Sequence, residues 1–415
     1  MDKLSKYKSP YDLTFLIAAD IFNRVLIQIF VSTLARKVDL DVLAYLTLAQ
    51  GIASFSLQYS EGSLNPLGLK RVEKNYKKSK YAEIIQLKVL ITAIYVVIVS
   101  MLILVIEYNF IWYFVIASVT PVLTCYNLQF VQQMKKQISK IALSRIAVGV
   151  VTSMSGIMML QFEIDSSYFL YLVPYAIGTA CFVLLSFNPG SLKEVVSSFT
   201  RLQFEGLINL FRISYKFGLL ALVLQMFQFV PLLFAPFFGQ HALEALGLST
   251  RVWFILAIPI SMFSVVLLPR MMRGEIVLRN WILSVNFFYL VLFGVSIFIG
   301  KTVLGILYGP QSQDYFKEVL LFCIAIPVWA TSNLILNFMI SKDESKGLVL
   351  GPMLSTLLLS VLLALLHRET GVYTAWFFAN SLLLIVLIHK MRSVSRRSVG
   401  YSSNSETYLP EIRTP

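Results

Sequence analysis

Twelve stretches of apolar residues, each long enough to cross a lipid bilayer, constrain the fold of this chain more than any other feature. A helix needs roughly 20 mostly apolar residues to span the hydrocarbon core of a membrane. The chain is therefore expected to be an all-α polytopic membrane protein with about 12 transmembrane helices. The stretches lie at residues 13–35, 42–66, 83–106, 110–133, 139–161, 167–187, 213–236, 242–268, 280–300, 316–340, 346–366 and 370–390.

The composition leaves little room for a soluble domain. Hydrophobic residues make up 57% of the 415 residues and charged residues only 14%, whereas a soluble domain carries about 25% charged residues. Cys125, Cys181 and Cys323 fall inside apolar stretches and are expected to be packed thiols, neither disulfide-bonded nor bound to metal. The three histidines lie far apart in the sequence, so no metal site is expected.

Basic residues gather in alternate connections between the apolar stretches. By the positive-inside rule, these connections are cytoplasmic, which places both termini in the cytoplasm and requires an even number of helices. The net charge of +13 is then mainly a topology signal with some attraction to anionic lipids, and nucleic acid is not an expected partner. The basic clusters are Lys3–Lys8, Lys70–Lys80, Lys135–Lys140, Lys193–Arg201, Arg270–Arg279, Lys342–Lys346 and Lys390–Arg397.

A repeat with a period of about 200 residues divides the chain into two halves. DLDVLAYLTLA (39–49) and GQHALEALGLS (239–249) share leucines at matching positions, and each begins the second helix of a six-helix unit. Because six is even, the two units have the same orientation in the membrane, as in a parallel repeat. We expect two six-helix lobes around a central cavity. The predicted domains are an N-terminal lobe (1–187), an amphipathic cytoplasmic linker (188–212), a C-terminal lobe (213–392) and a polar, disordered cytoplasmic tail (393–415).

Charged residues inside the apolar stretches are the strongest functional signal. A charge at the centre of a membrane-spanning helix costs roughly 2.5–3.5 kcal/mol on insertion scales, so it must face a protein interior or a water-filled cavity. Asp20 and Arg24 lie four residues apart near the middle of the first stretch, on one helix face. Two interpretations remain open for this pair. It is either a buried ion pair that fixes one helix to another, or part of a polar path through the membrane.

Further charges lie on other stretches. If the first, second, seventh and eighth helices face each other between the lobes, their charges form a positive cleft that favours an anionic ligand. The candidate binding residues are Arg24, Arg251, Arg145, Lys216 and Arg212, with Asp20 and Glu61 as candidates for ion coupling or charge pairing. Arg212, Lys216 and Lys88 also fit a simpler interpretation, in which their long side chains reach the membrane surface. Trp112, Tyr113, Trp281 and Trp376 are expected in the aromatic belts at the membrane interfaces.

The sequence contains no recognisable catalytic motif. There is no phosphate-binding glycine loop, no histidine near a serine or cysteine, and no pair of carboxylates in an exposed connection. The connections on the outer side are short, which argues against an enzyme that assembles polymers outside the membrane. We therefore expect a transporter, although a non-transporting membrane scaffold fits the same pattern.

Three stretches give the chain a family resemblance. They are LAYLTLAQGIASFSLQYSEGSLNP (43–66), the opening of the second half from Phe211 to Met271, and GILYGPQSQDYFKEVLLFCIAIPVW (305–329). Together with the basic N-terminus and the charged first helix, they resemble the Wzx-type polysaccharide flippases of the multidrug/oligosaccharidyl-lipid/polysaccharide (MOP) exporter superfamily.

The resemblance implies alternating access between two lobes in the bacterial inner membrane. The implied substrate is an undecaprenyl-diphosphate-linked oligosaccharide, such as an O-antigen repeat unit, which moves from the cytoplasmic to the outer leaflet. Related flippases have arginines at places comparable to Arg24 and Arg251, which implies that these two residues bind the diphosphate. No cofactor is implied beyond coupling to a proton or sodium gradient. The implied partners are a glycan polymerase and a chain-length regulator. The alternative is a drug or cation antiporter of the same superfamily.

Overall fold

The computed structural model describes residues 10–59, 79–106, 110–127, 132, 138–162, 167–186, 204–272, 278–341, 348–366 and 369–404. These residues are almost all helical and include no β-strand. Nine helices among them are long and apolar enough to cross a membrane, and three shorter apolar helices accompany them. Each of the apolar stretches identified in the sequence forms a helix, so the chain has the expected all-α polytopic architecture.

The first half contains α1 (Pro10–Ala35), α2 (Leu40–Tyr59), α4 (Ser79–Ile106), α5 (Ile111–Thr124), α7 (Ile138–Met159), the 3₁₀ turn η3 (Tyr168–Leu172) and α8 (Val173–Ser186). The second half contains α10 (Phe204–Phe234), η4 (Ala235–Phe238), α11 (Gln240–Met272), α12 (Leu278–Tyr308), η5 (Pro310–Tyr315), α13 (Phe316–Cys323), α14 (Ile326–Ser341), α15 (Leu350–Leu366) and α16 (Glu369–Asn404).

Prolines explain several of the helix boundaries. Proline has no backbone N–H and clashes with the preceding turn of a helix, but it is tolerated in the first turn. Pro327 lies in the first turn of α14, where the tenth apolar stretch is interrupted between Cys323 and Ile326. Pro174 likewise lies in the first turn of α8, after η3. A proline within an apolar stretch can kink a helix, and at these two positions the structure has a boundary between two helical segments.

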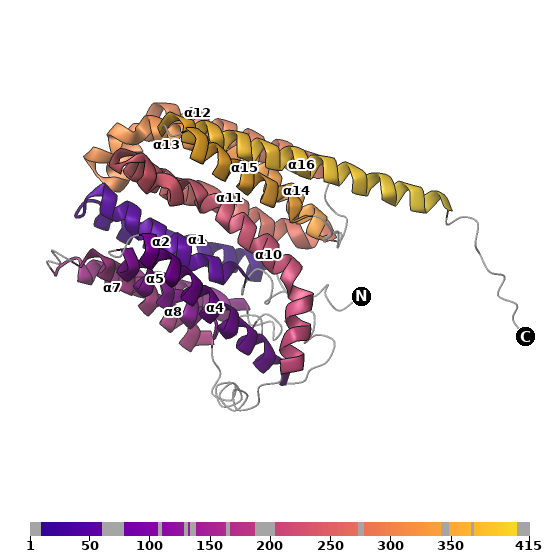
Figure 1. Cartoon of the computed structure of the whole chain (residues 1–415), viewed down its shortest axis with the longest axis horizontal. Coiled ribbons are helices and arrows are strands. Elements are labelled where there is room, and N and C mark those ends of the chain that lie inside the picture. Colours follow the sequence, from indigo (N-terminus) through magenta and orange to yellow (C-terminus); the bar gives the residue numbers. More distant parts are fainter. Residues whose placement is uncertain are drawn as a thin grey trace, which may run out of the picture.

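The two halves form two layers with matching internal packing (Figure 1). In the first half, α1 packs on α7, α7 on α8, α2 on α5, and α5 on α8. In the second half, the equivalent pairs are α10 with α15, α15 with α16, α11 with α13 and α14, and α14 with α16. Because the same pairs recur in the same order, the halves are two six-helix lobes related by a parallel repeat.

Helix α2 makes most of the contact between the lobes. It packs against both α10 and α11. The repeat relates the pair α2 and α10 to the pair α11 and α1, and this second pair makes only slight contact. Small residues allow the close approach of helices within a membrane. A Cβ atom on Gly247 of α11 would lie 2.4 Å from the Cβ atom of Ala44, and one on Gly51 of α2 would lie 2.0 Å from the ring of Phe229. The lobes are therefore tightly joined along α2 and little joined along α1.

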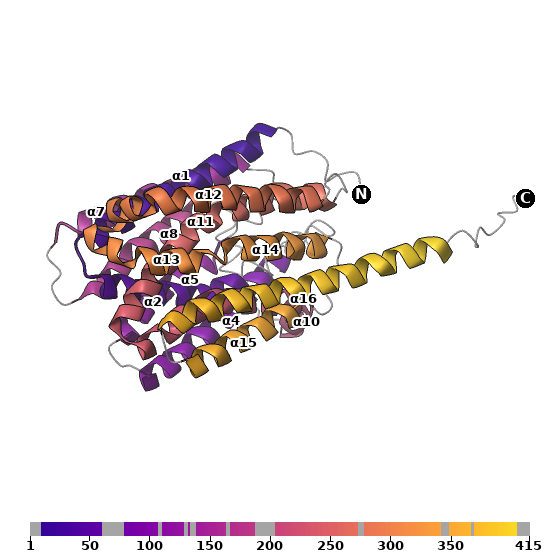
Figure 2. The same cartoon turned by 90° about the horizontal axis from the view of Figure 1, so that it is seen from above.

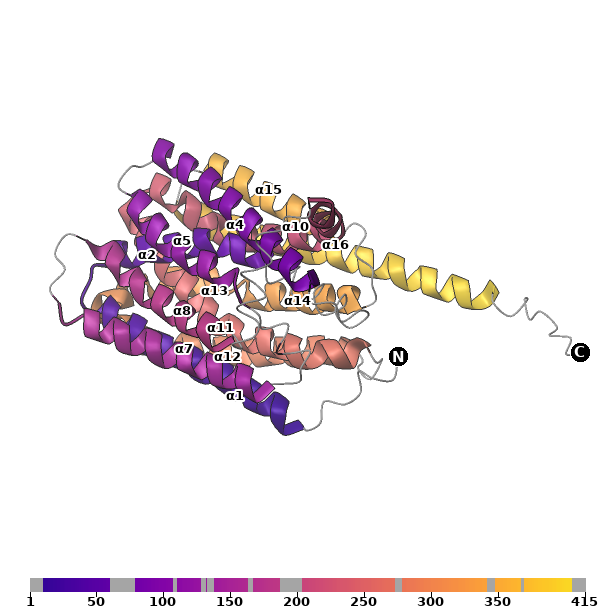
Figure 3. The same cartoon turned by 90° about the horizontal axis from the view of Figure 1, so that it is seen from below.

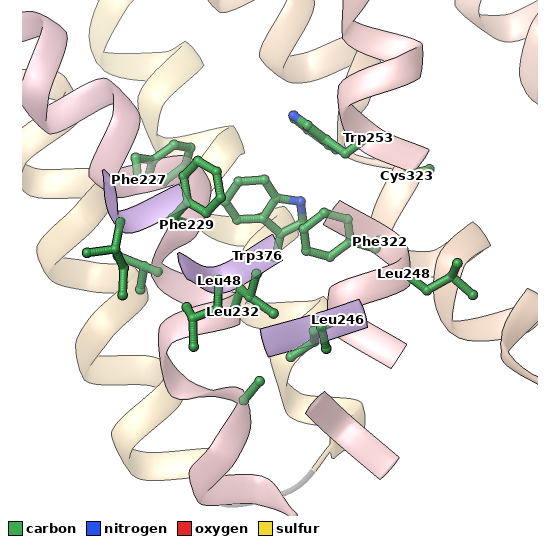
Figure 4. Close-up of a cluster of buried hydrophobic side chains, with 14 of the residues drawn as sticks. Leu48, Phe227, Phe229, Leu232, Leu246, Leu248, Trp253, Phe322, Cys323 and Trp376 are labelled. Atoms are coloured by element: carbon green, nitrogen blue, oxygen red, sulfur yellow. The ribbon is translucent and has the colours of Figure 1, made fainter. Parts of the chain in front are cut away.

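Aromatic side chains fill the core of the C-terminal lobe (Figure 4). Trp376 of α16 is fully buried, with the rings of Phe322 and Phe227 stacked on it at centroid distances of 5.0 Å and 5.0 Å. Trp253 meets it edge-on at 5.2 Å. The expectation that Trp376 belongs to an interface belt is therefore wrong. Helix α16 begins at Glu369, so Trp376 lies two turns inside the helix and faces the other helices of its lobe.

Replacing Trp376 with alanine is expected to destabilise the protein by about 3–5 kcal/mol, because the large cavity left behind loses its stacking partners. Phe298→Ala is the matched control, since the Phe298 side chain is 85% exposed on α12. The thermal unfolding midpoint of the detergent-purified protein measures both effects. Equal midpoints for the two variants would contradict the packing role of Trp376.

Two segment boundaries differ from expectation. Helix α16 continues to Asn404, so the expected disordered tail is helical over residues 393–404, and residues 405–415 lie outside the described ranges. Extending an existing helix costs far less than starting one, and no proline interrupts the chain before residue 410. Helix α10 already begins at Phe204, within the predicted linker 188–212, whose earlier residues are not described.

Candidate functional site

A row of polar side chains follows one face of α1. Asp20, Arg24, Gln28 and Ser32 recur every four residues, and at about 100° per residue they form a slowly turning stripe. On one side of the stripe lie the residues that pack on α7, and on the other lie exposed apolar residues such as Phe22 and Val25. A charged stripe in a membrane-spanning helix must avoid hydrocarbon, so it faces protein or water.

Asp20 is shared by two arginines. One carboxylate oxygen accepts a hydrogen bond from Nε of Arg24 at 3.2 Å, and the other accepts one from an Nη of Arg145 at 2.6 Å. The Asp20 side chain is 17% exposed, whereas those of Arg24 and Arg145 are 40% and 30% exposed. A single carboxylate therefore faces two guanidinium groups, and this cluster has a net positive charge.

The packing of α1 on α7 brings Arg145 to this cluster. Gly149 and Gly156 lie seven residues apart on one face of α7. Asn23 and Phe30 of α1 occupy the space above them, because a Cβ atom would lie 2.8 Å from Asn23 and 2.4 Å from the Phe30 ring. This close contact fixes the position of α7 along α1, with Arg145 one turn before Gly149.

The stripe reaches the C-terminal lobe at Tyr308, the last residue of α12. Nε2 of Gln28 donates a hydrogen bond to the Tyr308 hydroxyl at 3.0 Å. Arg251 of α11 lies close enough to the same hydroxyl to interact with it electrostatically. The Arg251 side chain is only 9% exposed, and its Nε atom has no hydrogen-bond partner among the described residues. The hydroxyls of its neighbours Ser249 and Thr250 are also buried without a partner there.

Helices α1 and α12 meet at one end of the bundle and diverge toward the other. We call the end where α1 begins and α16 ends the terminal end, and the opposite end the far end. At the far end, Arg36 donates a hydrogen bond to the carbonyl of Ile306. In Figures 2 and 3, α1 and α12 lie together there and diverge toward Pro10 and Leu278. The stripe therefore runs from the joined far end toward the terminal end, where the two helices are apart.

Of the remaining predicted site residues, only Arg212 has a described side chain, and it does not join this cluster. Arg212 is exposed near the start of α10. Glu61 and the side chain of Lys216 lie outside the described part of the structure. Lys88 is fully buried in α4, so the expectation that its side chain reaches the membrane surface is wrong. Its neighbours include Cys125 and Thr92, whose side chains hydrogen-bond to each other.

Sequence reasoning missed Tyr308 and the unpaired hydroxyls of Ser249 and Thr250. Tyr308 ends a long apolar helix, where a tyrosine is usually taken for an interface residue. Only the approach of α1 and α11 to this point gives it a polar environment. Among the described residues, no group of histidine, cysteine, aspartate and glutamate side chains is arranged to hold a metal ion.

No protein-family model matches the sequence, and no curated protein resembles it significantly. Its fold, however, resembles solved membrane transporters over almost the whole chain. The lipid II flippase MurJ, in an inward closed conformation, gives a TM-score of 0.68 at 11% identity, covering 95% of this chain and 93% of that chain. An inward-facing multidrug resistance MATE transporter of the MOP superfamily gives 0.64 at 11% identity, covering 94% and 96%.

A third similar structure is a MOP superfamily transporter from Pyrococcus furiosus, described as having a binding pocket of reverse polarity. It gives a TM-score of 0.61 at 10% identity, covering 92% of this chain and 95% of that chain. The chain is thus a multi-pass membrane protein with the fold of the MOP superfamily transporters. At these identities the likeness concerns the fold alone, so the chemistry of the site has to indicate the substrate.

Proposed function

We propose that the protein is a flippase that moves an undecaprenyl-diphosphate-linked oligosaccharide, such as an O-antigen repeat unit, from the cytoplasmic to the outer leaflet. The observation that carries this proposal is the excess of arginine on α1, α7 and α11. Arg24 and Arg145 share the single carboxylate of Asp20, and Arg251 is buried with an unpaired Nε atom. Such a site favours an anion.

A diphosphate fits these side chains chemically. Guanidinium groups bind phosphate oxygens through paired, charge-assisted hydrogen bonds. The unpaired Nε of Arg251 adds a donor for the same oxygens. A buried donor without a partner costs free energy, and a bound phosphate removes that cost. The substrate therefore supplies the acceptors that the described protein residues lack.

The arrangement of the lobes suits alternating access. With the termini in the cytoplasm, as the basic connections predict, the far end is the outer side, and α1 and α12 diverge toward the cytoplasmic side. A lipid-linked sugar enters from the inner leaflet in this conformation. The protein would lie in the bacterial inner membrane, next to a glycan polymerase and a chain-length regulator that use its product.

Asp20 is the candidate for coupling to a proton or sodium gradient. Both of its oxygens are hydrogen-bonded to arginines in this structure. A diphosphate that takes over Arg24 and Arg145 leaves the carboxylate of Asp20 without these two partners, and its negative charge is then available to a coupling cation. Substrate binding and ion binding would in this way be linked at one residue.

The alternative is a drug or cation antiporter, which the likeness to a multidrug MATE transporter brings into consideration. A cationic drug requires an acidic or apolar site. Asp20 is one carboxylate beside the three guanidinium groups of Arg24, Arg145 and Arg251, and this excess of positive charge repels such a substrate. The flippase is therefore the better match to the site.

Complementation tests the proposal. In a strain that lacks the protein, the wild-type chain is expected to restore surface polysaccharide on a gel, and Arg24→Ala to restore less than a tenth of it. Arg279→Ala is the matched control, because Arg279 is exposed at the start of α12. Membrane levels are compared by immunoblot. Unchanged surface glycan in the deletion strain, together with increased drug sensitivity, would instead favour the antiporter.

A further inference from the structure

An apolar groove lies inside the C-terminal lobe, apart from the charged stripe. Helices α11, α12 and α13 enclose it, with the interruption between α13 and α14 at one side. Its volume is about 150 Å³. Two small residues, Ser296 and Cys323, make room along walls that are formed mainly by leucine, isoleucine, valine and phenylalanine side chains, and the Phe316 ring packs on Gly300.

The few polar groups in the lining are already satisfied. The Tyr289 hydroxyl donates to the carbonyl of Leu256 at 2.7 Å, and Ser296 Oγ donates to the carbonyl of Leu292 at 2.8 Å. The groove therefore offers a polar molecule no free partner, and an apolar cavity of this kind excludes water. Its lining selects a hydrocarbon occupant.

The groove connects the lipid-facing surface with the polar site. On one side, Val303 lines the groove and is 40% exposed, next to the exposed side chains of Ile299 and Ile306 on α12. On the other side, Cys323 lines the groove, and it lies close enough to Tyr308 to interact with it electrostatically, as Arg251 does. An amphipathic molecule with an anionic head and an apolar chain matches this order of surfaces.

We propose that this groove binds the first isoprene units of the substrate's polyprenyl chain while the diphosphate lies at Arg251. This inference rests on the proposed flippase function and extends it to the lipid part of the substrate. The tail then contributes to recognition instead of remaining wholly in the bilayer. A chain held beside Arg251 also fixes the direction in which the diphosphate and its sugars extend, into the space between the lobes.

Filling the groove provides the test. Ser296→Phe places a ring in the space, and Ser284→Phe is the matched control. Ser284 is exposed on the same helix, and its hydroxyl makes the same type of bond to a carbonyl four residues earlier. The full-length purified protein in detergent is titrated with undecaprenyl diphosphate and, separately, with inorganic diphosphate.

We expect Ser296→Phe to weaken binding of undecaprenyl diphosphate about tenfold and to leave inorganic diphosphate unaffected, with no change for Ser284→Phe. Arg251→Met should weaken both ligands. If Ser296→Phe binds undecaprenyl diphosphate as the wild type does, the groove inference is overturned and the flippase stands. If Arg251→Met binds both ligands normally, the proposed diphosphate site is refuted, whatever the result for Ser296→Phe. Displacement of undecaprenyl diphosphate by phosphatidylglycerol would identify a general lipid site and also overturn the inference.

A milder variant covers the case in which Ser296→Phe fails to fold. Ser296→Cys is made in a chain whose three native cysteines are alanine, and its reaction with methyl methanethiosulfonate is timed. Undecaprenyl diphosphate is expected to slow this reaction at least fivefold, and inorganic diphosphate is expected to have no effect. Equal reaction rates with and without the lipid would contradict occupation of the groove.

Discussion

Arg251→Met is expected to abolish glycan export and yet to leave the protein at least as stable as the wild type. The side chain is 9% exposed and its Nε atom has no described partner, so the folded protein bears the cost of a poorly compensated charge. An apolar side chain of similar length removes that cost, which amounts to about 2–3 kcal/mol for a charge at the centre of a membrane helix. A structural role and a substrate-binding role therefore predict opposite changes in stability.

The two measurements are the thermal unfolding midpoint in detergent and the surface glycan restored in a deletion strain. Arg251→Lys is the informative companion, because it keeps the charge and loses the paired geometry of the guanidinium group. We expect it to retain roughly a tenth of the export, corresponding to about 1.4 kcal/mol. Normal export by Arg251→Met would refute the diphosphate site, and a lower midpoint without loss of export would assign Arg251 to structure alone.

Gly247→Leu is expected to hold the lobes apart at the far end and to stop transport. A Cβ atom at this position would lie 2.4 Å from the Ala44 Cβ atom and 2.7 Å from the Ala44 Cα atom. Backbone atoms do not move aside as a flexible side chain does, so α2 and α11 have to separate. Overpacking of this kind costs about 1–3 kcal/mol. That cost shifts the balance between the two conformations by roughly five- to 150-fold.

Spin labels at Gln161→Cys and Gln311→Cys, both exposed near the far end of their lobes, report this separation. The native cysteines are replaced by alanine for the measurement. Gly247→Leu should populate a longer distance than its parent. Gly294→Leu is the matched control, because a Cβ atom there meets nothing within 4 Å. The same distance distribution in all three proteins would show that the contact between Gly247 and Ala44 does not control the far end.

Much of the fold could be predicted from the sequence, because bilayer thickness and loop charge act on each segment independently. The helix positions needed only the lengths of the apolar stretches. The interruption of the tenth stretch before Pro327 was less accessible, since a proline in an apolar run can either bend or end a helix. Trp376 was misplaced although the expected start of its helix, residue 370, nearly matches Glu369, because the length of an apolar stretch does not tell which helix face packs on the rest of the lobe.

The candidate site was predictable only in its local part. The spacing of Asp20 and Arg24 identifies one helix face directly. That Arg145 reaches the same carboxylate depends on the contact of Gly149 and Gly156 with α1, and paired glycines alone do not reveal which helix they meet. The position of Arg251 beside Tyr308 requires both lobes at once, and no local pattern reports a contact between lobes.

The uneven contact between the lobes bears on which cargoes the protein tolerates. The lobes adhere where α2 packs on α10 and α11, and they barely touch where α1 meets α11. A carrier with this contact has a lateral opening on the side where its lobes hardly touch, and the diameter of that opening is not fixed. A closed ring limits the width of the substrate. A lateral opening lets a branched sugar chain extend outside the carrier while the protein holds the lipid part. The number of sugars in the repeat unit would then matter less than the chemistry of the linkage to the lipid.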